Sequence, residues 1–522
     1  MFSLLYLKLI RHPQLGDLEI HFQDESQEGS FQRDQPFSTV IIGNNGTGKS
    51  FLLKTVVDIF REFSNYQESE VKDFYFPFQF HLRYRYFDEV YEILSTGYTV
   101  GRIRRKISFS YLLNRPFDFE INANVYGTQT GYEISLLEVE LPWKMLAGSV
   151  LLNDRFPFQD SNPKDMYQYL GVRRTRSVAS TKSFLRKSVR YLFEASKKEN
   201  FVEQLGDILE FMGFEKSCKV RYTTRYHDRF FTGHLDASGL SEFYENWRES
   251  TNRNSTPWGE WYYQQLKNGG ENRLQELIDY INEVTNDPNR IKFKDRSKSK
   301  ILEIDFFEEF RGANEFLYVN DLDTMNLLQL DSIQILKKDQ QIGLSDTSAG
   351  EYHLVLSLLG LFSRMDKNSL ILIDEPEISL HPKWQMQYIN FLKRMFHNFP
   401  SCHFVIASHS HFLISDLEKE SSSVVAIRRD EEGTFRPELI KANTYGWSAE
   451  QVLMDVFQTA STRNYYLTEE LGSIFELISR EPTEEIHQQI LQKVADLREL
   501  DLSGIKEEDP LRIVLDKLLA KF

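Results

Sequence analysis

The sequence predicts an α/β fold: a mixed sheet with flanking helices, interrupted by a β-rich subdomain and a helical insertion and followed by a helical tail. Two observations support this prediction. An apolar run at residues 40–42 leads through a glycine-rich loop into a helical pattern, and a second apolar run, at residues 370–373, ends in two acidic residues. Buried strands that end in polar loops next to helices are typical of α/β domains.

From these patterns we divide the chain into five parts. The predicted head is built from residues 1–63 and 325–466, because both stretches carry the strand and loop patterns just described. Between them we place a β-rich subdomain at 64–160 and a mainly helical insertion at 161–324, on the periodicity of their apolar residues. A tail of three predicted helices follows at 467–522. Its apolar stripe is expected to pack within the protein, with docking of a partner as the alternative.

A phosphate-binding loop is predicted at residues 43–50. Strand patterns at residues 3–10, 17–22 and 37–42 precede it and a helical pattern follows, which is the context that G-x-x-x-x-G-K-[ST] requires. In such a loop the backbone N–H groups turn toward the phosphates, the lysine reaches the β- and γ-phosphates, and the hydroxyl ligates Mg²⁺. We therefore expect ATP and Mg²⁺ as cofactors, held by Asn45, Gly46, Gly48, Lys49 and Ser50, of which Ser50 is the metal ligand.

Two adjacent acids, Asp374 and Glu375, follow the apolar run at residues 370–373. A carboxylate at the end of a buried strand can hold Mg²⁺, and the next acid is then placed to orient and deprotonate the attacking water. A solvated acidic turn would show the same pattern, but the phosphate-binding lysine in the same chain favours catalysis. We therefore assign Asp374 to the metal and Glu375 to the water.

A serine and a glycine open a helical pattern near residue 348. Their hydroxyl and N–H groups, together with the helix dipole, make an anion site. Ser348 and Gly350 are therefore candidate contacts to the γ-phosphate of a nucleotide on a second copy of the chain. An ordinary helix start explains the same residues, with Ser348 as N-cap and Glu351 completing a capping box. Both interpretations stay open at this point.

A third apolar run, at residues 404–407, ends in Ser-His-Ser-His. A histidine at such a strand end can contact the γ-phosphate and report whether it is present. We favour His409 over His411 for this catalytic role because it lies nearer the end of the strand.

The composition excludes several classes of function. With 62 Lys and Arg against 77 Asp and Glu, the net charge of -15 does not fit a basic nucleic-acid coat. The two cysteines, Cys218 and Cys402, lack a C-x-x-C partner, which argues against a disulfide framework and fits a reducing cytoplasm. No apolar run approaches the roughly 20 residues of a membrane span, so a transporter head is not expected.

One basic stretch is a candidate nucleic-acid contact. Seven basic residues, uninterrupted by any acid, lie between positions 173 and 190: Arg173, Arg174, Arg176, Lys182, Arg186, Lys187 and Arg190. A solvated or partner-binding basic face explains the stretch equally well.

The order of these motifs resembles that of ABC-type ATPases of the SMC/RecF/OLD group. The resemblance covers roughly residues 1–60 and 325–460, and its elements are Walker A (Gly43–Ser50), the signature (Ser348–Glu351), Walker B (Leu370–Glu375), the D-loop (Ser379–Pro382) and the switch histidine (Ser408-His409). It implies an ABC-type ATPase head, two copies of which close head to tail around ATP and hydrolyse it to ADP and phosphate.

The sequence departs from that group at two motifs. Thr347, Ala349 and Glu351 replace the usual Leu, first Gly and Gln of the signature. The usual Q-loop glutamine is not evident, and Gln159 is a weak candidate for it.

Three shorter segments, at residues 154–157, 169–173 and 444–453, are similar to the PtuA family, the ATPase subunits of Septu-type and some retron antiphage defence systems. This resemblance implies a homodimer or a higher oligomer of dimers, an HNH nuclease partner of the PtuB type and, in retron contexts, a reverse transcriptase with its multicopy single-stranded DNA. The chain has no His-Asn-His pattern, so nuclease activity is expected in another chain.

The sequence thus predicts an ATPase that regulates the nuclease of a bacterial antiphage defence complex. The alternative is a RecF-like DNA-repair or DNA-end-binding ATPase, which would use the basic stretch on DNA.

Overall fold

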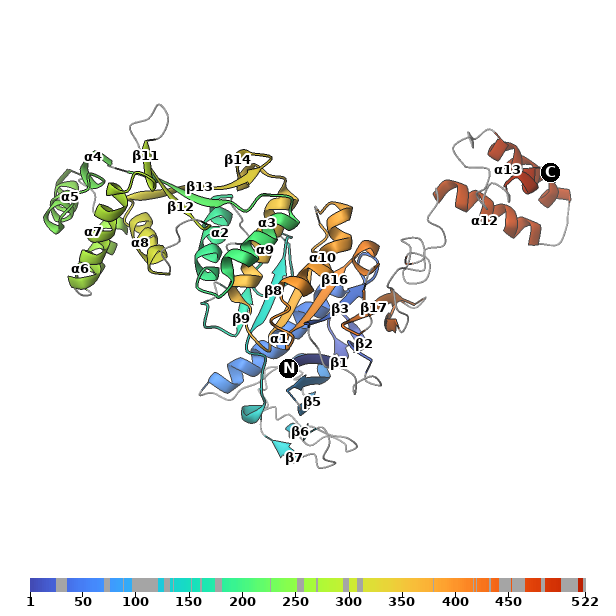
Figure 1. Cartoon of the computed structure of the whole chain (residues 1–522). Helices are drawn as coiled ribbons and strands as arrows, with labels where there is room; N and C mark the ends of the chain where they lie inside the picture. The colour runs from blue at the N-terminus through green and yellow to red at the C-terminus, as the bar shows by residue number, and fades with distance from the viewer. Residues whose placement is uncertain are drawn as a thin grey trace. The chain divides into compact units, whose positions relative to one another are not determined.

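The structure is a computed structural model of the chain (Figure 1). It describes residues 1–24, 35–69, 76–87, 89–95, 121–125, 132–134, 136–151, 153–159, 162–173, 181–225, 227–250, 258–268, 271–293, 300–307, 313–378, 380–415, 417–418, 420–430, 433–440, 452, 465–479, 484–498 and 515–519. The chain forms two compact units, Met1–Gly446 and Trp447–Phe522.

A seven-stranded sheet forms the centre of the first unit, in the order β18-β17-β3-β16-β15-β8-β9. Its strands are β3 (Phe37–Ile42), β8 (Met145–Ser149), β9 (Tyr167–Tyr169), β15 (Leu370–Asp374), β16 (His403–Ser408), β17 (Ser422–Arg429) and β18 (Phe435–Ile440). All neighbours run parallel except β17 and β18. The inner parallel strands are buried along their whole length, which explains their unbroken apolar runs. The predicted α/β class is confirmed.

The register of this sheet brings four loops of distant sequence to one edge. Asp374 at the end of β15 pairs with Ala407 of β16 and with Ser149 of β8, and Ala407 in turn pairs with Ile41 of β3. Because all four strands are parallel, their carboxyl ends meet, and the loops that follow them lie side by side.

A six-stranded antiparallel sheet, in the order β2-β1-β4-β5-β6-β7, forms a second layer. Its strands are β1 (Phe2–His12), β2 (Gly16–His21), β4 (Gln79–Tyr86), β5 (Glu89–Ser95), β6 (Ile121–Val125) and β7 (Tyr132–Ile134). The strands predicted at residues 3–10 and 17–22 are present, but they pair with the β-rich part rather than with β3. The short 3-10 turn η2 (Leu136–Glu138) follows this sheet.

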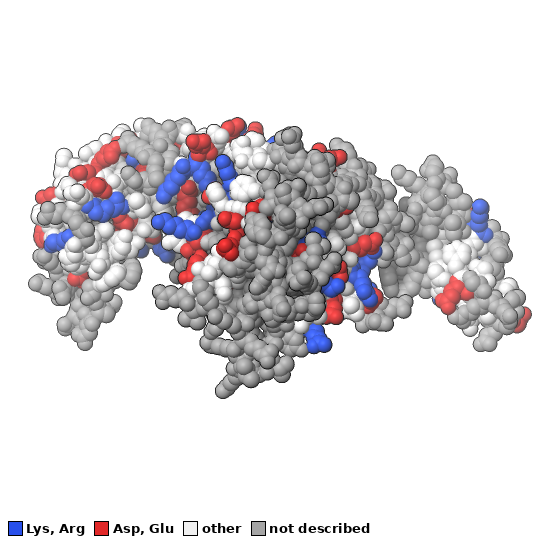
Figure 2. Space-filling view, turned by 90° about the horizontal axis from the view of Figure 1, so that it is seen from below, with Lys and Arg blue, Asp and Glu red and all other residues white. Residues whose placement is uncertain are grey.

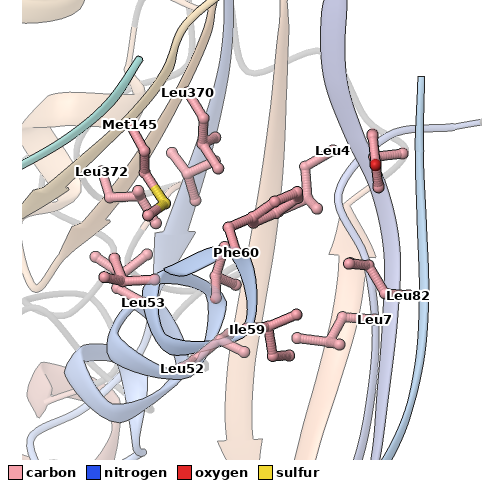
Figure 3. Close-up of a cluster of buried hydrophobic side chains, with 14 of the residues drawn as sticks. Leu4, Leu7, Leu52, Leu53, Ile59, Phe60, Leu82, Met145, Leu370 and Leu372 are labelled. Atoms are coloured by element: carbon pink, nitrogen blue, oxygen red, sulfur yellow. The ribbon is translucent and has the colours of Figure 1, made fainter. Parts of the chain in front are cut away.

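Helix α1 (Lys49–Glu68) lies between the two sheets. Figure 3 shows its residues Leu52, Leu53, Ile59 and Phe60 packed among side chains of both. The remaining labelled members of this cluster come from β1, β4, β8 and β15: Leu4, Leu7, Leu82, Met145, Leu370 and Leu372. The helix that starts at the phosphate loop is therefore held from two sides, which fixes the position of its first turn.

Two helices cover the opposite face of the seven-stranded sheet. They are α9 (Ala349–Arg364) and α10 (Pro382–Met395). Alternate residues of a strand point to opposite faces, and Ile373 of β15 accordingly lines a pocket with residues of both helices. Helices α2 (Thr181–Ala195) and α3 (Phe201–Phe211) pack on α9 in turn.

Two strands that the sequence predicts, at residues 301–306 and 327–336, belong to a further sheet, which is built from the predicted insertion and from the start of the second stretch of the predicted head. It is antiparallel, in the order β11-β12-β10-β13-β14, with strands β10 (Cys218–Thr224), β11 (Ile291–Phe293), β12 (Lys300–Asp305), β13 (Leu328–Lys337) and β14 (Gln340–Gly343). The helices around it are α4 (His227–Phe230), α5 (Ala237–Ser250), α6 (Trp258–Asn268), α7 (Glu271–Asn286) and α8 (Ala313–Thr324), and the 3-10 turn η3 (Leu344–Asp346) leads to α9. The expectation of a mainly helical insertion overlooked β10, where Cys218, Val220 and Tyr222 are buried and alternate with polar residues.

The second unit has its own small core. Helices α12 (Tyr465–Ser479) and α13 (Glu484–Arg498) and the helical turn 515–519 enclose the buried residues Leu471, Ile474, Leu477, Ile490, Val494, Leu497, Leu515 and Leu518. The expected self-packing of the apolar stripe is confirmed. Among the residues described in both units, no helix combines the length and the hydropathy that a membrane span requires.

Candidate nucleotide site

Glycines shape the phosphate loop, either through a left-handed backbone or through a close approach of a neighbouring element. Gly46 and Gly48 have φ angles of 77° and 83°, in the left-handed region. A Cβ atom on Gly48 would stand 2.5 Å from Cδ2 of Leu15, and one on Gly43 would stand 2.4 Å from the carbonyl oxygen of Ile427 on β17. The loop is therefore braced by β17 and by the turn before β2, while Asn45 and Gly46 lie at its exposed tip.

Lys49 begins α1 and points back across the loop. Its buried ammonium donates to the carbonyl oxygens of Gly43 (2.9 Å) and Asn44 (3.2 Å) and lies 3.1 Å from the ring nitrogens of His409. Burial lowers the pKa of this lysine to about 8, while the negative charges of Glu375, Asp374 and Glu377 act in the opposite direction and raise it. A lysine surrounded by three carboxylates stays cationic at neutral pH, as a phosphate contact requires.

Ser50 and Asp374 meet although 324 positions separate them in the chain. The serine hydroxyl donates to Oδ1 of Asp374 at 3.0 Å, and the carboxylate is 2 % exposed. Burial is the main reason why the pKa of Asp374 rises to about 7, so this acid is held in a place that disfavours its charge. A hydroxyl and a carboxylate oxygen in contact are the donor set that Mg²⁺ prefers, so the pair fits the predicted metal ligands.

Glu375 is held in an unusual backbone conformation. Its φ angle is 51°, and its N–H continues the parallel ladder by donating to the carbonyl of Ala407 at 2.9 Å. This turn directs the carboxylate to His409, whose Nε2 lies 3.0 Å from Oε1. The hydrogen bond from His409 holds the pKa of Glu375 below its usual value. Left-handed backbone in a non-glycine residue is uncommon and is concentrated at functional sites.

His409 is the histidine that the fold places at the phosphate loop. Its ring contacts both Lys49 and Glu375, and its backbone N–H donates to Oε1 of Glu377 at 2.6 Å. His411 begins the 3-10 turn η4 (His411–Ile414) and lies against the ring of Phe412. Lys49, Ser50, Asp374, Glu375 and His409 thus lie together in one constellation, while the roles assigned to them from the sequence stay predictions.

Ser348 and Glu351 form a capping box at the start of α9. The serine hydroxyl accepts from the N–H of Glu351 at 3.2 Å, and the glutamate carboxylate accepts from the N–H of Ser348 at 2.9 Å and from Lys337 at 2.8 Å. The helix-start interpretation of Ser348 is confirmed. Gly350 lines the same pocket as Asp374. A contact of Ser348 or Gly350 with the nucleotide of a second copy stays a prediction.

Two arginines outside the ATPase motifs also lie at the phosphate loop. Arg429, at the end of β17, donates to the carbonyl of Gly46 at 2.8 Å and stacks on Phe435, with 4.9 Å between guanidinium carbon and ring centre. Arg155 stacks in the same way on Phe51, the residue after Ser50. Spacing could not show that either arginine reaches the loop, because Arg429 ends β17 and Arg155 lies between β8 and β9, both far from the loop in the sequence.

Gln159, the weak candidate for the Q-loop, lies beside other partners. Its amide donates to Asp165 at 3.2 Å and accepts from Arg61 at 3.5 Å. Neither of these partners belongs to the constellation around Lys49.

Two of the segments that resemble the PtuA family form one buried network. Arg173 is paired with Asp154 at 2.7 Å, and Tyr169 donates to the same carboxylate at 2.7 Å. The side chain of Asp154 is 0 % exposed, and the carbonyl of Phe156 accepts a further bond from Arg173. The third segment, residues 444–453, lies outside the described residues except for Val452.

The basic stretch is largely committed to the fold where it is described. Arg173 is bound to Asp154, and Lys187 donates to the carbonyl of Gly171 at 2.7 Å. Arg190 pairs with Glu194, and Arg186 with Asp323, although the Arg186 side chain remains 63 % exposed. Arg174, Arg176 and the side chain of Lys182 lie outside the described residues. Lys and Arg lie interspersed with Asp and Glu over the described part of the face in Figure 2.

Comparison with known proteins agrees with this site. A family model described as an AAA ATPase domain matches residues 14–414, more than half of the chain. The chain is 27% identical over 160 residues to the Septu protein PtuA of Bacillus thuringiensis, a match that covers 30% of this chain and 37% of that protein. It is 22% identical over 121 residues to the retron Vc95 probable ATPase of Vibrio cholerae serotype O1 biovar El Tor, covering 21% of this chain and 23% of the relative.

Solved structures of SMC heads also resemble the chain at low similarity. The SMC head domain from Thermotoga maritima is 10% identical, covers 84% of this chain and 99% of its own, and gives a TM-score of 0.33. An Smc head bound to the C-winged helix domain of ScpA gives 0.31 at 10% identity, covering 84% of this chain and 97% of its own. These TM-scores are too low to carry an argument. The chain spans less than two fifths of the curated relatives' lengths, whereas the family model covers most of the chain. On the family match and the geometry together, the chain belongs to the AAA ATPase domain family.

Proposed function

We propose that this chain binds ATP with Mg²⁺, hydrolyses ATP, and acts as the regulatory ATPase subunit of a bacterial antiphage defence complex. The observation that carries the enzymatic part is the constellation at the carboxyl ends of β3, β15 and β16. One lysine, one hydroxyl, two carboxylates and one imidazole converge there from motifs up to 360 positions apart.

Each side chain has a role that its contacts support. Lys49 and the loop N–H groups bind the phosphates, and Ser50 with Asp374 would hold the metal. Mg²⁺ would supply charge neutralisation at the phosphate oxygens. Glu375 orients the attacking water and accepts its proton, which its lowered pKa allows at neutral pH because the carboxylate is ionised. His409 holds Glu375 in place and lies beside Lys49, where the γ-phosphate is expected.

The general-base assignment is tested with Glu375→Gln. The amide keeps the shape of the side chain but cannot accept the proton, so we expect kcat to fall by roughly 100-fold or more while ATP still binds. Phosphate release gives the rate, and a fluorescent ATP analogue gives the affinity. Glu203→Gln, at an exposed position of α3, is the matched control. Hydrolysis at the wild-type rate by Glu375→Gln would remove Glu375 from this role.

The defence role rests on similarity and on the site. The PtuA protein and the retron ATPase are named as parts of the Septu and retron systems, which supports a role in antiphage defence. The partners that we propose in a cytoplasmic complex are an HNH-type nuclease and, in a retron context, a reverse transcriptase with its single-stranded DNA. We propose that ATP holds two copies of the chain head to tail and thereby controls the nuclease. The described part of the basic stretch is mostly paired within the fold, which favours this function over RecF-like DNA repair.

The partner is tested by co-purification. Expressed with the genes that lie beside its own, the tagged chain should retain a small HNH-type nuclease, and Lys49→Ala should alter that nuclease's activity in the complex. Retention of no neighbour, together with salt-dependent binding of DNA ends by the isolated chain, would support the repair function instead.

A further inference from the structure

We propose that Gln385 is a positioning residue for hydrolysis. It joins the loop after Asp374 and Glu375, whose described residues 376–378, 380 and 381 we call the post-acid loop, to the loop that carries His409, which we call the switch loop (residues 408–411). The inference rests on the proposed function, because it concerns the placement of His409 at the same site.

Gln385 lies in the first turns of α10 and uses both ends of its amide. Its Nε2 donates to the carbonyl oxygens of Leu380 (2.9 Å) and Glu377 (3.3 Å), both in the post-acid loop. Its Oε1 accepts from the hydroxyl of Ser410 in the switch loop at 2.6 Å. One side chain therefore bridges two loops that leave neighbouring strands.

Ser410 links this bridge to the backbone of the switch loop. Its N–H donates to the hydroxyl of Ser408 at 2.8 Å, and its own hydroxyl accepts from the N–H of Phe412 at 3.2 Å, capping the 3-10 turn η4. The residue between the two serines is His409. Fixing Ser410 therefore fixes the backbone that aims the imidazole.

A second contact between the same loops supports the same direction of control. The N–H of His409 donates to the carboxylate of Glu377, at 2.6 Å, while the carbonyl of Glu377 accepts from Gln385. The post-acid loop thus holds the switch loop on both sides of His409, once through Glu377 and once through Gln385 and Ser410.

The consequence for catalysis follows from short distances. His409 lies 3.0 Å from Glu375 and 3.1 Å from Lys49, and hydrogen bonds weaken steeply when such distances grow. A displacement of the post-acid loop, such as a second copy of the chain would cause on contact, is carried by Gln385 to His409. Closure of the assembly and orientation of the water would then be coupled through one amide.

A purely structural role for Gln385 predicts something different. A glutamine that only satisfies carbonyl oxygens at a helix start stabilises the fold and leaves the chemical step unchanged. The two roles can be distinguished by kinetics. A positioning role lowers kcat and leaves KM nearly unchanged, because Lys49 and Ser50, which bind the nucleotide, do not touch Gln385, whereas a purely structural role leaves kcat unchanged.

The test uses the full chain with Gln385→Met, Ser410→Ala and the double variant. Methionine keeps the length of the side chain but makes none of the three hydrogen bonds, so we expect kcat for ATP to fall roughly 10- to 100-fold with KM within about twofold of the wild type. Ser410→Ala should lower kcat in the same way. The double variant should be no slower than Gln385→Met, because both changes break one connection.

Controls keep the outcome decisive. Gln387→Met changes the same residue type at an exposed position of α10, two residues further on, and should keep the wild-type kcat. A wild-type kcat in Gln385→Met, or additive losses in the double variant, would overturn the proposal. If Gln385→Met does not fold, as judged by thermal unfolding, Ser410→Ala decides alone, and a wild-type kcat there overturns it.

Failure of the proposed function gives a different result. The wild-type chain would then release no phosphate from ATP, and a fluorescent ATP analogue would not be displaced by ATP. With turnover by the wild type established, every comparison among the variants bears on Gln385.

Discussion

At the scale of single residues, His12 shows how a side chain outside every motif supports the phosphate loop. Its Nδ1 accepts from the N–H groups of Gln14 (3.2 Å) and Leu15 (3.1 Å), and its Nε2 lies 3.0 Å from the hydroxyl of Thr55 on α1. Leu15, fixed in this way, packs against Gly48. Burial lowers the pKa of His12 to about 4, so the ring is neutral in the folded protein at neutral pH.

This histidine makes stability depend on pH in a defined window. Between its ordinary pKa of 6.5 and the folded value of about 4, the unfolded chain binds a proton that the folded chain does not. Stability should therefore fall as the pH falls through this window, by on the order of 3 kcal/mol from this group. Urea unfolding at pH 7, 6 and 5 measures the slope.

The matched comparison is His12→Gln, which should be less stable at pH 7 and lose less stability on going to pH 5. His397→Gln, at an exposed site, should keep the wild-type slope. Equal slopes in wild type and His12→Gln would show that another group carries the acid sensitivity.

Single residues also show what the sequence can and cannot reveal. Lys49, Ser50, Asp374, Glu375 and His409 were placed together from their motifs, because each stands at a recognisable strand end. Gln385 and Arg429 could not be found in this way. Both donate to backbone carbonyls, which every residue possesses, and only the folded chain determines which carbonyl lies within reach.

At the scale of elements, the start of α9 combines a structural function with a predicted ligand contact. Ser348 caps the helix in the structure, and its proposed contact with phosphate on a second copy needs the same hydroxyl. The two functions can be separated by residues that cap equally well but differ in charge.

We expect Ser348→Ala to cost about 1 kcal/mol of stability, and Ser348→Asn and Ser348→Asp to cost little, because both are good N-caps. If Ser348 faces a phosphate, the aspartate should prevent ATP-dependent dimerisation of Glu375→Gln, while the neutral asparagine should permit it. Thermal unfolding and light scattering with ATP measure the two effects. If Ser348→Asp in the Glu375→Gln background dimerised at the same ATP concentration as Glu375→Gln alone, Ser348 would have no contact with phosphate and would act only as a helix cap.

Strand β10 shows why the structure of the insertion could be predicted only in part from the sequence. The alternation of Cys218, Val220 and Tyr222 with polar residues was visible, but it is short and is flanked by longer helical patterns. Its two neighbours are β12 and β13, whose own strand signals lie about eighty positions and more downstream. A seven-residue strand whose partners are distant in the sequence is difficult to predict from local periodicity.

At the scale of the whole molecule, the two compact units have separate cores. Among the described residues, the buried cluster of the second unit is formed by α12, α13 and the turn at 515–519. Damage to one core should therefore leave the other intact.

Ile474, 0 % exposed in α12, offers the test. Ile474→Ala should cost roughly 2–5 kcal/mol in the second unit. Hydrogen exchange should then speed up in residues 465–519 and stay unchanged in β3 and β16, and ATP turnover should not change. Glu476→Ala, on the exposed side of the same helix, is the control. Faster exchange in β3 would show that the two units unfold together.

The general architecture was predictable, but the strand order was not. Motif order indicated an α/β head, since buried strands before polar loops are a local signal. The N-terminal strands and the β-rich part share one sheet because β1 pairs with β4. The sequence of neither strand indicates which strand it pairs with. The division into five parts made from the sequence stays a prediction.

The place of β3 in its sheet has a consequence for the time at which the protein becomes active during synthesis. β3 lies between β16 and β17, and the carbonyl of Ile427 on β17 supports Gly43. The ribosome makes β3 early, yet both of its neighbours are more than 360 residues later in the chain. At about 5–20 residues per second, the phosphate loop waits many seconds without its sheet. A nascent chain should therefore acquire its nucleotide pocket only when nearly all of the first unit has left the exit tunnel.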